Sequence, residues 1–301
     1  MMSLNEFAEQ MVQDVSKKLE SEEFHDLECK VVSNVKKNNC DRCGIFIGMN
    51  GVDAVLYADE AYQRYIMGTS FEEILENTTN QFKQALGSND FGNINEVAKI
   101  ITDYEKAKAG LLITLVGIKG NEEMLENHPH RVVEDMAVMY RIMGDIFGEP
   151  HGSVPVSNGL LERWGIAEEQ LHKDAVQNSV KNFPAEFRGL FECLGGLCEG
   201  VNASEEAYVA NTMYNFGASV ILYPGFLEDI AERFNTDLII LPSSIHDCII
   251  IPCNEEKIKK GAAPLLKMVK EINATQVAPE DRLTDNVYFY DRKNKKFGIM
   301  N

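Results

Sequence analysis

Apolar side chains near the start of the chain recur at helical spacing. Successive members lie four residues apart, which places them on one face of a helix. These positions are Phe7, Met11, Val15 and Leu19. Between residues 44 and 58, two apolar segments flank Asn50-Gly51, the pair favoured in tight hairpin turns. Helical patterns near 60–67 and 70–86 follow, so this region predicts a helix, a hairpin and further helices.

Two long apolar runs in the middle of the chain predict central strands. Leu111–Ile118 is continuous and rich in branched residues, which indicates burial on both faces of a sheet. Val132–Met143 is the second run, and Ser153–Ser157 is expected to be a short edge strand. Helical patterns follow at Asn158–Trp164 and Ala167–Asn182.

The last third of the chain alternates short strands with helices. One helix is expected just after Pro224, because proline is tolerated in the first helical turn, and another at Ala263–Ile272. Strands are predicted at Met213–Phe216, Leu238–Leu241, His246–Ile251, Val287–Tyr290 and Phe297–Ile299. The segment Phe183–Asn211 has no clear pattern.

These elements together predict an α+β fold with a mixed or antiparallel sheet covered by helices. The pattern divides the chain into residues 1–89, a helix–hairpin–helix portion, and residues 90–301, a larger α+β domain. Packing of both portions as one unit stays open as an alternative, because a chain of 301 residues lies near the size at which a single core divides.

The composition is that of an ordinary globular protein, 45% hydrophobic and 25% charged. No stretch approaches the roughly 18 to 20 apolar residues that cross a bilayer. The first residues lack the basic and continuously apolar segments of a signal peptide. Seven cysteines, an odd number, do not resemble the disulfide framework of a secreted domain. We therefore expect a cytoplasmic protein.

The formal net charge of −18 changes the list of plausible partners. Sustained negative potential repels nucleic acids and anionic membranes, so direct binding to either is not expected. One interpretation of the charge is solubility. The other is an acidic surface that imitates DNA and inhibits a nucleic-acid enzyme, which requires one continuous negative face.

Short motifs of known chemistry are mostly missing from the sequence. It contains no phosphate-binding G-x-x-x-x-G-K-[ST] loop, no G-x-G-x-x-G, no H-E-x-x-H and no calcium loop. Cys40-x-x-Cys43 lacks the second cysteine pair of a structural zinc site, and it precedes a strand rather than a helix. Incidental thiols are the preferred interpretation, and we expect neither a metal nor a cofactor.

Two polar segments border apolar strands and are the candidate ligand sites. His130 and Arg131 precede a predicted central strand; a structural ion pair of Arg131 with a nearby acid is the alternative to binding. Ser243-Ser244-x-His246-Asp247 combines the residue types of a hydrolase triad. Adjacent strand residues point to opposite faces, so Asp247 does not readily orient His246.

Six segments spread over most of the chain form a recognisable set: Pro129-His130-Arg131, Asp135–Arg141 (DMAVMYR), Leu222–Gly225 (LYPG), Leu241–Asp247 (LPSSIHD), Asn273–Thr275 (NAT) and Ala278–Glu280 (APE). In these segments the chain resembles one uncharacterised family of gut Clostridia, the domain-of-unknown-function family 5688. Asp247 departs from the glutamate usual in that family. Residues 135–180 also resemble, distantly, a second uncharacterised bacterial family. The resemblance implies a bacterial cytosolic origin and no particular activity.

The preferred hypothesis is a non-enzymatic binding or regulatory protein that contacts a protein or a small ligand. Pockets commonly form where polar groups gather at the ends of apolar strands. The candidate ligand-binding residues are therefore His130, Arg131, Ser243, Ser244, His246 and Asp247. Two alternatives stay open: a hydrolase that uses His246 with Ser243 or Ser244, and an acidic inhibitor of a nucleic-acid enzyme.

Overall fold

The chain forms two compact units, Met1–Lys99 and Ile100–Asn301. The computed structural model describes residues 2–21, 24, 26–38, 40–49, 52–87, 99–144, 153–193, 207–213, 215–253 and 261–300. All strand pairs in these residues are antiparallel, and helices cover the sheets, so the predicted α+β class is confirmed. The predicted division between residues 89 and 90 falls outside the described residues.

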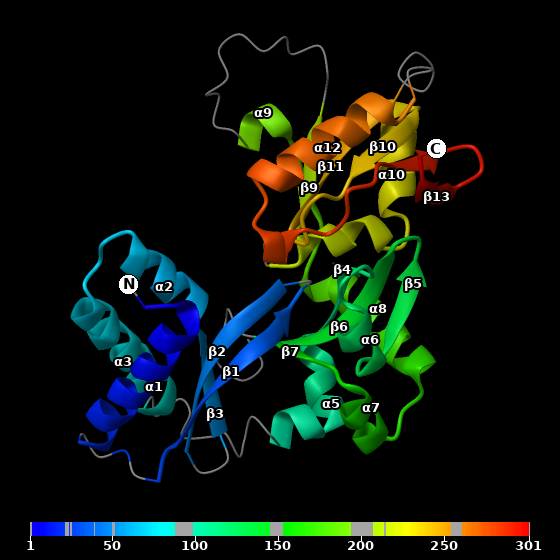
Figure 1. The fold of residues 1–301 in the computed structure, drawn as a ribbon. Helices are drawn as coiled ribbons and strands as arrows, with labels where there is room; N and C mark the ends of the chain where they lie inside the picture. Colours follow the sequence, from blue (N-terminus) through cyan, green and yellow to red (C-terminus); the bar gives the residue numbers. More distant parts are fainter. Residues whose placement is uncertain are drawn as a thin grey trace. The chain divides into compact units, whose positions relative to one another are not determined.

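The first unit is a three-stranded sheet with three helices on one face (Figure 1). Its helices are α1 (Leu4–Glu20), α2 (Ala58–Ile66) and α3 (Phe71–Gly87). Its strands, in the sheet order β1-β2-β3, are β1 (Glu28–Lys37), β2 (Cys40–Met49) and β3 (Val52–Tyr57). The predicted stripe of α1 is fully buried, with Phe7, Met11, Val15 and Leu19 at 0% exposure.

The predicted helix–hairpin–helix arrangement of this unit omits one observed strand, β1. β2 and β3 pair in the register Ile45↔Leu56 and correspond to the two segments of the predicted hairpin. Their expected turn at Asn50-Gly51 lies outside the described residues. β1 pairs with the other edge of β2, although its sequence, ECKVVSNVKK, shows little alternation. A strand of this composition is specified by its neighbour rather than by its own pattern.

The second unit contains two sheets. The six-stranded sheet has the order β13-β12-β10-β11-β9-β8. Its strands are β8 (Glu186–Gly189), β9 (Tyr208–Asn211), β10 (Asp237–Leu241), β11 (Asp247–Cys253), β12 (Tyr288–Asp291) and β13 (Lys296–Ile299). The four-stranded sheet has the order β4-β6-β5 with β7 on β6, formed by β4 (Leu111–Gly117), β5 (His130–Val133), β6 (Met136–Met143) and β7 (Ser153–Pro155).

Helices of the second unit cover both faces of its sheets (Figure 1). They are α5 (Tyr104–Ala107), η1 (Lys108–Gly110), α6 (Glu122–Glu126), α7 (Asn158–Trp164), α8 (Glu168–Asn182), α9 (Leu190–Cys193), η3 (Gly217–Leu222), α10 (Phe226–Phe234), α12 (Ala263–Thr275) and η4 (Pro279–Asp281). Alternate residues of β10 serve two cores, because Ile239 packs on the α12 side and Ile240 on the α10 side.

Two predicted strands differ from the observed ones. Val132–Met143 is not one strand but the end of β5, a two-residue turn and β6. The turn contains Glu134, which adopts a positive φ of 57° that ends the extended run. Met213–Phe216 is not a strand either; residues 215 and 216 form a turn, and the strand is β9, four to five residues earlier. Apolar content alone does not show where an extended segment reverses.

A hydrogen-bonded carboxylate fixes the β5–β6 turn to the C-terminal part of the second unit. Asp135 accepts hydrogen bonds from the Thr284 hydroxyl at 2.7 Å, the Asn286 amide at 2.9 Å and the Tyr288 hydroxyl. Burial and the adjacent Asp135 raise the pKa of Tyr288, so this phenol stays a donor. No helix among the described residues is long and apolar enough to cross a membrane.

Candidate functional site

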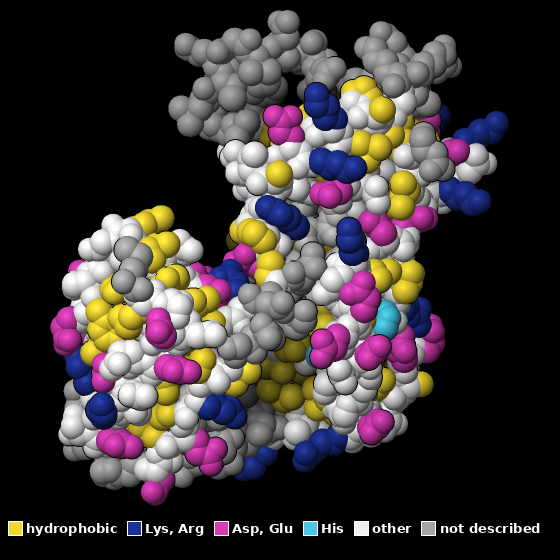
Figure 2. All heavy atoms as spheres, viewed as in Figure 1, with side chains coloured by type: hydrophobic (Ala, Val, Ile, Leu, Met, Phe, Trp, Pro, Cys, Tyr) yellow, Lys and Arg dark blue, Asp and Glu magenta, His cyan; other side chains and the backbone are white. Residues whose placement is uncertain are grey.

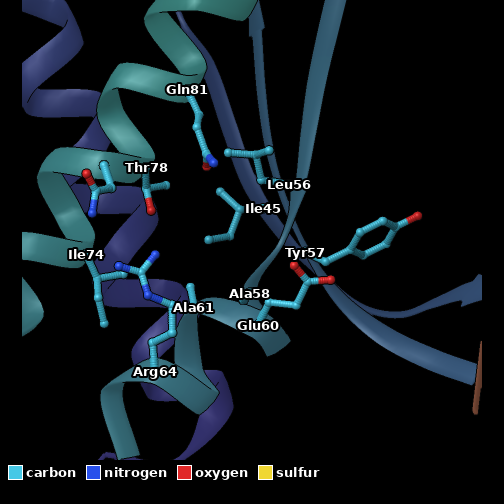
Figure 3. A pocket seen from close by; sticks show the side chains of 11 residues that line it. Ile45, Leu56, Tyr57, Ala58, Glu60, Ala61, Arg64, Ile74, Thr78 and Gln81 are labelled. Atoms are coloured by element: carbon cyan, nitrogen blue, oxygen red, sulfur yellow. The ribbon is translucent and has the colours of Figure 1, made fainter. Parts of the chain in front are cut away.

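A cavity of about 230 Å³ opens in the first unit between the sheet and helices α2 and α3 (Figure 3). Its apolar lining is Ile45, Leu56, Ala58, Ala61 and Ile74. Its polar lining is Tyr57, Glu60, Arg64, Asn77, Thr78 and Gln81. A few polar groups around an apolar floor are typical of small-molecule sites.

The local sequence explains both the floor and the empty space. Ile45 and Leu56 are cross-strand partners, so their side chains project from the same face of the sheet. Ile74 of α3 is 1% exposed and completes this apolar wall. On α2, the side chains nearest the floor belong to Ala58 and Ala61, three residues apart on one helical face. Alanine supplies too little volume to fill the gap, which therefore remains open.

Thr78 is a largely buried residue whose hydroxyl makes no hydrogen bond within the described residues. The residue is 6% exposed and lines the cavity, and its side chain makes no hydrogen bond to any of them. The next residue, Thr79, is the natural comparison, because its hydroxyl donates to the Leu75 carbonyl at 2.7 Å. Among the described residues, only the side-chain oxygens of Asn211 and Asn273 are fully buried without a hydrogen-bond partner, so the Thr78 hydroxyl is accessible from the cavity. Thr78 therefore presents an unused polar group to the cavity.

Glu60 and Arg64 place opposite charges on the rim of the same cavity. They lie four residues apart on α2, the spacing at which helical ion pairs usually form. Their charged groups nevertheless do not come within 4.0 Å of each other. Figure 3 shows the Arg64 guanidinium directed toward Thr78, whereas the Glu60 carboxylate is directed toward Tyr57. Both charges are therefore available to a molecule in the cavity.

No residue of this cavity belongs to the motifs that mark candidate site residues in the sequence. A signal was nevertheless present in α3, whose buried stripe includes Ile74, Leu75 and Phe82. Thr78 and Thr79 occupy the middle of that stripe, where apolar residues are expected. Threonine in a helix often bonds the carbonyl four residues earlier, so the sequence did not distinguish the unpaired Thr78 from the paired Thr79.

The predicted residues His130 and Arg131 lie on β5 of the second unit. As neighbours in a strand they project to opposite faces of the sheet. Nδ1 of His130 is 3.0 Å from the carbonyl oxygen of His128. Arg131 forms an ion pair with Glu169 of α8, and this hydrogen bond raises the pKa of the guanidinium. Arg131 thus forms a structural ion pair, the alternative to ligand binding, but its partner lies on a helix distant in sequence rather than on a nearby acidic residue.

His246 has a defined partner on each ring nitrogen. The backbone N–H of Phe216 donates to Nδ1 at 3.2 Å, so the ring proton resides on Nε2. Nε2 lies 3.2 Å from a carboxylate oxygen of Asp281 and donates to it. The Ser244 hydroxyl accepts from the backbone N–H of His246 at 3.0 Å rather than from the ring. A carboxylate orients this imidazole, but a backbone amide occupies the position that a nucleophilic hydroxyl would need.

The segment around His246 is tightly built. Phe216 has a φ of 67°, which is rare for a bulky residue and stores strain. The Arg141 guanidinium lies over the Phe216 ring at 4.9 Å from its centroid, and the same guanidinium donates to Ser153. A Cβ on Gly217 would lie 2.5 Å from the His246 carbonyl oxygen, so only glycine fits there.

Asp247 begins β11 and is the cross-strand partner of Asn211. Burial raises the pKa of the Asp247 carboxyl, and the adjacent His246 opposes that effect. The buried side-chain oxygen of Asn211 has no hydrogen-bond partner among the described residues. The backbone oxygen of Ser243, the remaining predicted residue, accepts from the N–H of Leu283.

The predicted residues form two groups with different internal partners. Arg131 bonds to α8, and His246 bonds to the loops that carry Phe216 and Asp281. Among the described contacts, no hydrogen bond or ion pair joins His130 or Arg131 to His246. Their role in ligand binding stays a prediction.

Cys40 and Cys43 both lie on β2 and therefore do not flank a helix start. Burial raises the pKa of the Cys43 thiol, which disfavours the reactive thiolate. Within the residues that the structure describes, no group of three or more histidine, cysteine or acidic side chains is arranged to hold a metal ion.

A family model matches residues 4–292, which include every cavity residue and every predicted site residue. Its description is a family of unknown function, DUF5688. The chain belongs to this family. No curated protein and no solved structure shows significant similarity to it. Membership in DUF5688 implies no activity, and the Clostridia origin and the second resemblance stay predictions.

Proposed function

We propose that this protein is a non-enzymatic binding protein that holds a small ligand in the cavity of its first unit. The observation that carries the proposal is a cavity whose apolar floor is bordered by the Thr78 hydroxyl and two charged side chains, none of which forms a hydrogen bond or ion pair within the described residues. Polar groups that open onto a cavity and are not used inside the protein are available to hydrogen-bond a bound molecule.

Features of the second unit favour binding over hydrolysis. A hydrolase that uses His246 needs a serine hydroxyl on the ring, but Phe216 N–H and the Asp281 carboxylate take both ring nitrogens. Ser244 is engaged through its own hydrogen bond to the backbone. The cavity is therefore the preferred ligand site over His130, Arg131 and residues 243–247, because many polar groups of those residues already form hydrogen bonds or ion pairs within the protein.

The acidic-inhibitor alternative has less support. It requires a continuous negative face, whose binding weakens steeply with salt. On the face drawn in Figure 2, the acidic side chains of the described residues lie among lysine and arginine over each unit. The proposal places the protein in the cytoplasm, in keeping with six described cysteines that are all free.

The test is a methyl-resolved NMR titration of the full-length protein. Ile45, Leu56 and Ile74 report on the cavity, and Ile113 of β4 reports on the second unit. Separate mixtures of neutral, anionic, cationic and zwitterionic small molecules are added at millimolar concentration. We expect at least one mixture to shift the three cavity methyl signals and leave Ile113 unchanged.

A cavity-filling variant locates the binding. Ala61→Leu introduces a larger side chain into the cavity and should abolish the shifts, whereas Gln63→Leu, an exposed position of the same helix, should preserve them. Absence of cavity shifts with all four mixtures would refute the proposed function. Equal effects of the two variants would place binding elsewhere.

A further inference from the structure

The size of the cavity limits its occupant to a small metabolite. At about 230 Å³ it lies below the roughly 300–1,000 Å³ of sites for drug-sized ligands. A nucleotide or a peptide would extend beyond the cavity, whereas a small metabolite fits within it. The apolar floor formed by Ile45, Leu56 and Ile74 requires part of the occupant to be hydrocarbon, because burying these surfaces against a polar ligand gains little.

The polar lining divides into a cationic and an anionic side. Figure 3 shows the Arg64 guanidinium of α2 and the Thr78 hydroxyl of α3 directed toward each other on the helical side of the cavity. A guanidinium and a hydroxyl together donate the hydrogen bonds that a carboxylate accepts. The Glu60 carboxylate is directed away from them and is suited to an ammonium group.

Glu60 and Arg64 are exposed residues at the cavity rim, and their charged groups form no ion pair with each other. In the cavity each is instead directed to a different side (Figure 3). A ligand with charges of both signs satisfies both residues at once, and it leaves the cavity electrically neutral. A ligand with one charge leaves Glu60 or Arg64 unpaired.

We propose that the cavity binds a free α-amino acid with a branched apolar side chain. Its carboxylate is held by Arg64 and Thr78, its ammonium group by Glu60, and its side chain lies on Ile45, Leu56 and Ile74. The inference rests on the proposed function and names the ligand class of that same site.

The test compares three ligands of nearly equal shape in calorimetric titrations of the full-length protein. L-Leucine carries both charges, 4-methylpentanoate lacks the ammonium group, and 3-methylbutylamine lacks the carboxylate. We expect leucine to bind about tenfold to a hundredfold more tightly than either analogue, the factor expected for losing a hydrogen bond between charged groups. Equal binding of leucine and an analogue would overturn the inference, since it requires both charges.

Variants assign each charge to its side chain. Glu60→Gln should weaken leucine binding about tenfold or more and leave 4-methylpentanoate unaffected. Arg64→Gln should weaken leucine and leave 3-methylbutylamine unaffected. Thr78→Val, which preserves shape, should weaken the two carboxylates but not the amine. The controls Glu76→Gln on α3 and Lys17→Gln on α1 change charge outside the cavity and should leave all three affinities unchanged.

The two proposals fail in different ways. If leucine causes no heat and no cavity methyl shift, but a neutral or purely anionic mixture shifts Ile45, Leu56 and Ile74, the amino-acid inference is wrong and the binding function stands. If no mixture shifts them, both are wrong. If leucine binds but Glu60→Gln and Arg64→Gln bind it as tightly as the unchanged protein, the site lies elsewhere and the inference is overturned.

Discussion

The polar groups around His246 and those around the first-unit cavity differ in whether they have hydrogen-bond partners within the protein. His246 has a partner on each ring nitrogen, and Ser244 bonds the backbone beside it. The Thr78 hydroxyl and the exposed Arg64 guanidinium, which both line the cavity, have no such partner in the described residues. A polar group that the fold already uses positions the chain, whereas an unused one is free to recognise a ligand. The comparison favours the cavity over the motif-rich segment.

The largest expected loss of stability tests the view that motif residues of the second unit hold its fold. Asp135→Ala removes the acceptor of three hydrogen bonds and leaves the Tyr288 hydroxyl unpaired. We expect the free energy of unfolding to fall by about 2–4 kcal/mol. Urea unfolding followed by fluorescence of Trp164, the single tryptophan, reports on this unit. The exposed neighbour variant Glu134→Ala is the control, and a similar loss there would contradict the assignment.

His246→Ala is the next test, and it concerns the His246 region of the second unit directly. It removes the acceptor for the Phe216 N–H and the donor to Asp281, and the free energy of unfolding should fall by about 1–3 kcal/mol. His246→Asn retains a short polar side chain with an acceptor and should recover part of the loss in the same measurement. Unchanged stability of His246→Ala would show that the imidazole is not structural and would revive its candidacy for catalysis.

Adjacent threonines of α3 test the cavity with smaller effects. Thr79→Val loses the bond to the Leu75 carbonyl and should destabilise the first unit by about 0.5–1.5 kcal/mol. Thr78→Val removes an unpaired hydroxyl and should leave stability unchanged within about 0.5 kcal/mol or raise it. Amide hydrogen exchange of α3 in the ligand-free protein measures both. A larger loss for Thr78→Val than for Thr79→Val would show that Thr78 has an internal partner.

Asp247 gives the smallest expected effect, and it depends on pH. Burial raises its pKa in the folded protein, so the folded state favours the protonated carboxyl. The associated stability is complete below the ordinary aspartate pKa of about 3.9 and is lost as the pH rises through the higher folded-state value. Asp247→Asn should remove this part of the pH dependence and add a donor beside the unpaired Asn211 oxygen. Urea unfolding at several pH values checks it, and an unchanged pH profile would contradict the raised pKa.

The sequence by itself determined the elements whose patterns are local. The stripe of α1 and the continuous run of β4 depend on side chains a few residues apart. The α+β class follows from such elements. The turn at Glu134 and the strand β1 escaped prediction, because a chain reversal and a neighbouring strand specify them rather than their own periodicity.

Only the tertiary structure decided which polar side chains form hydrogen bonds or ion pairs within the protein. Arg131 and Glu169 are 38 positions apart, and Phe216 and His246 are 30 apart, so no local pattern indicates that they bond. The cavity has the same origin: Ile45, Ala61 and Thr78 come from a strand and two helices whose packing leaves a gap that alanine does not fill. Whether a donor or an acceptor has a hydrogen-bond partner depends on the residues that pack around it. A sequence lists the donors and acceptors, and folding determines which of them remain for a ligand.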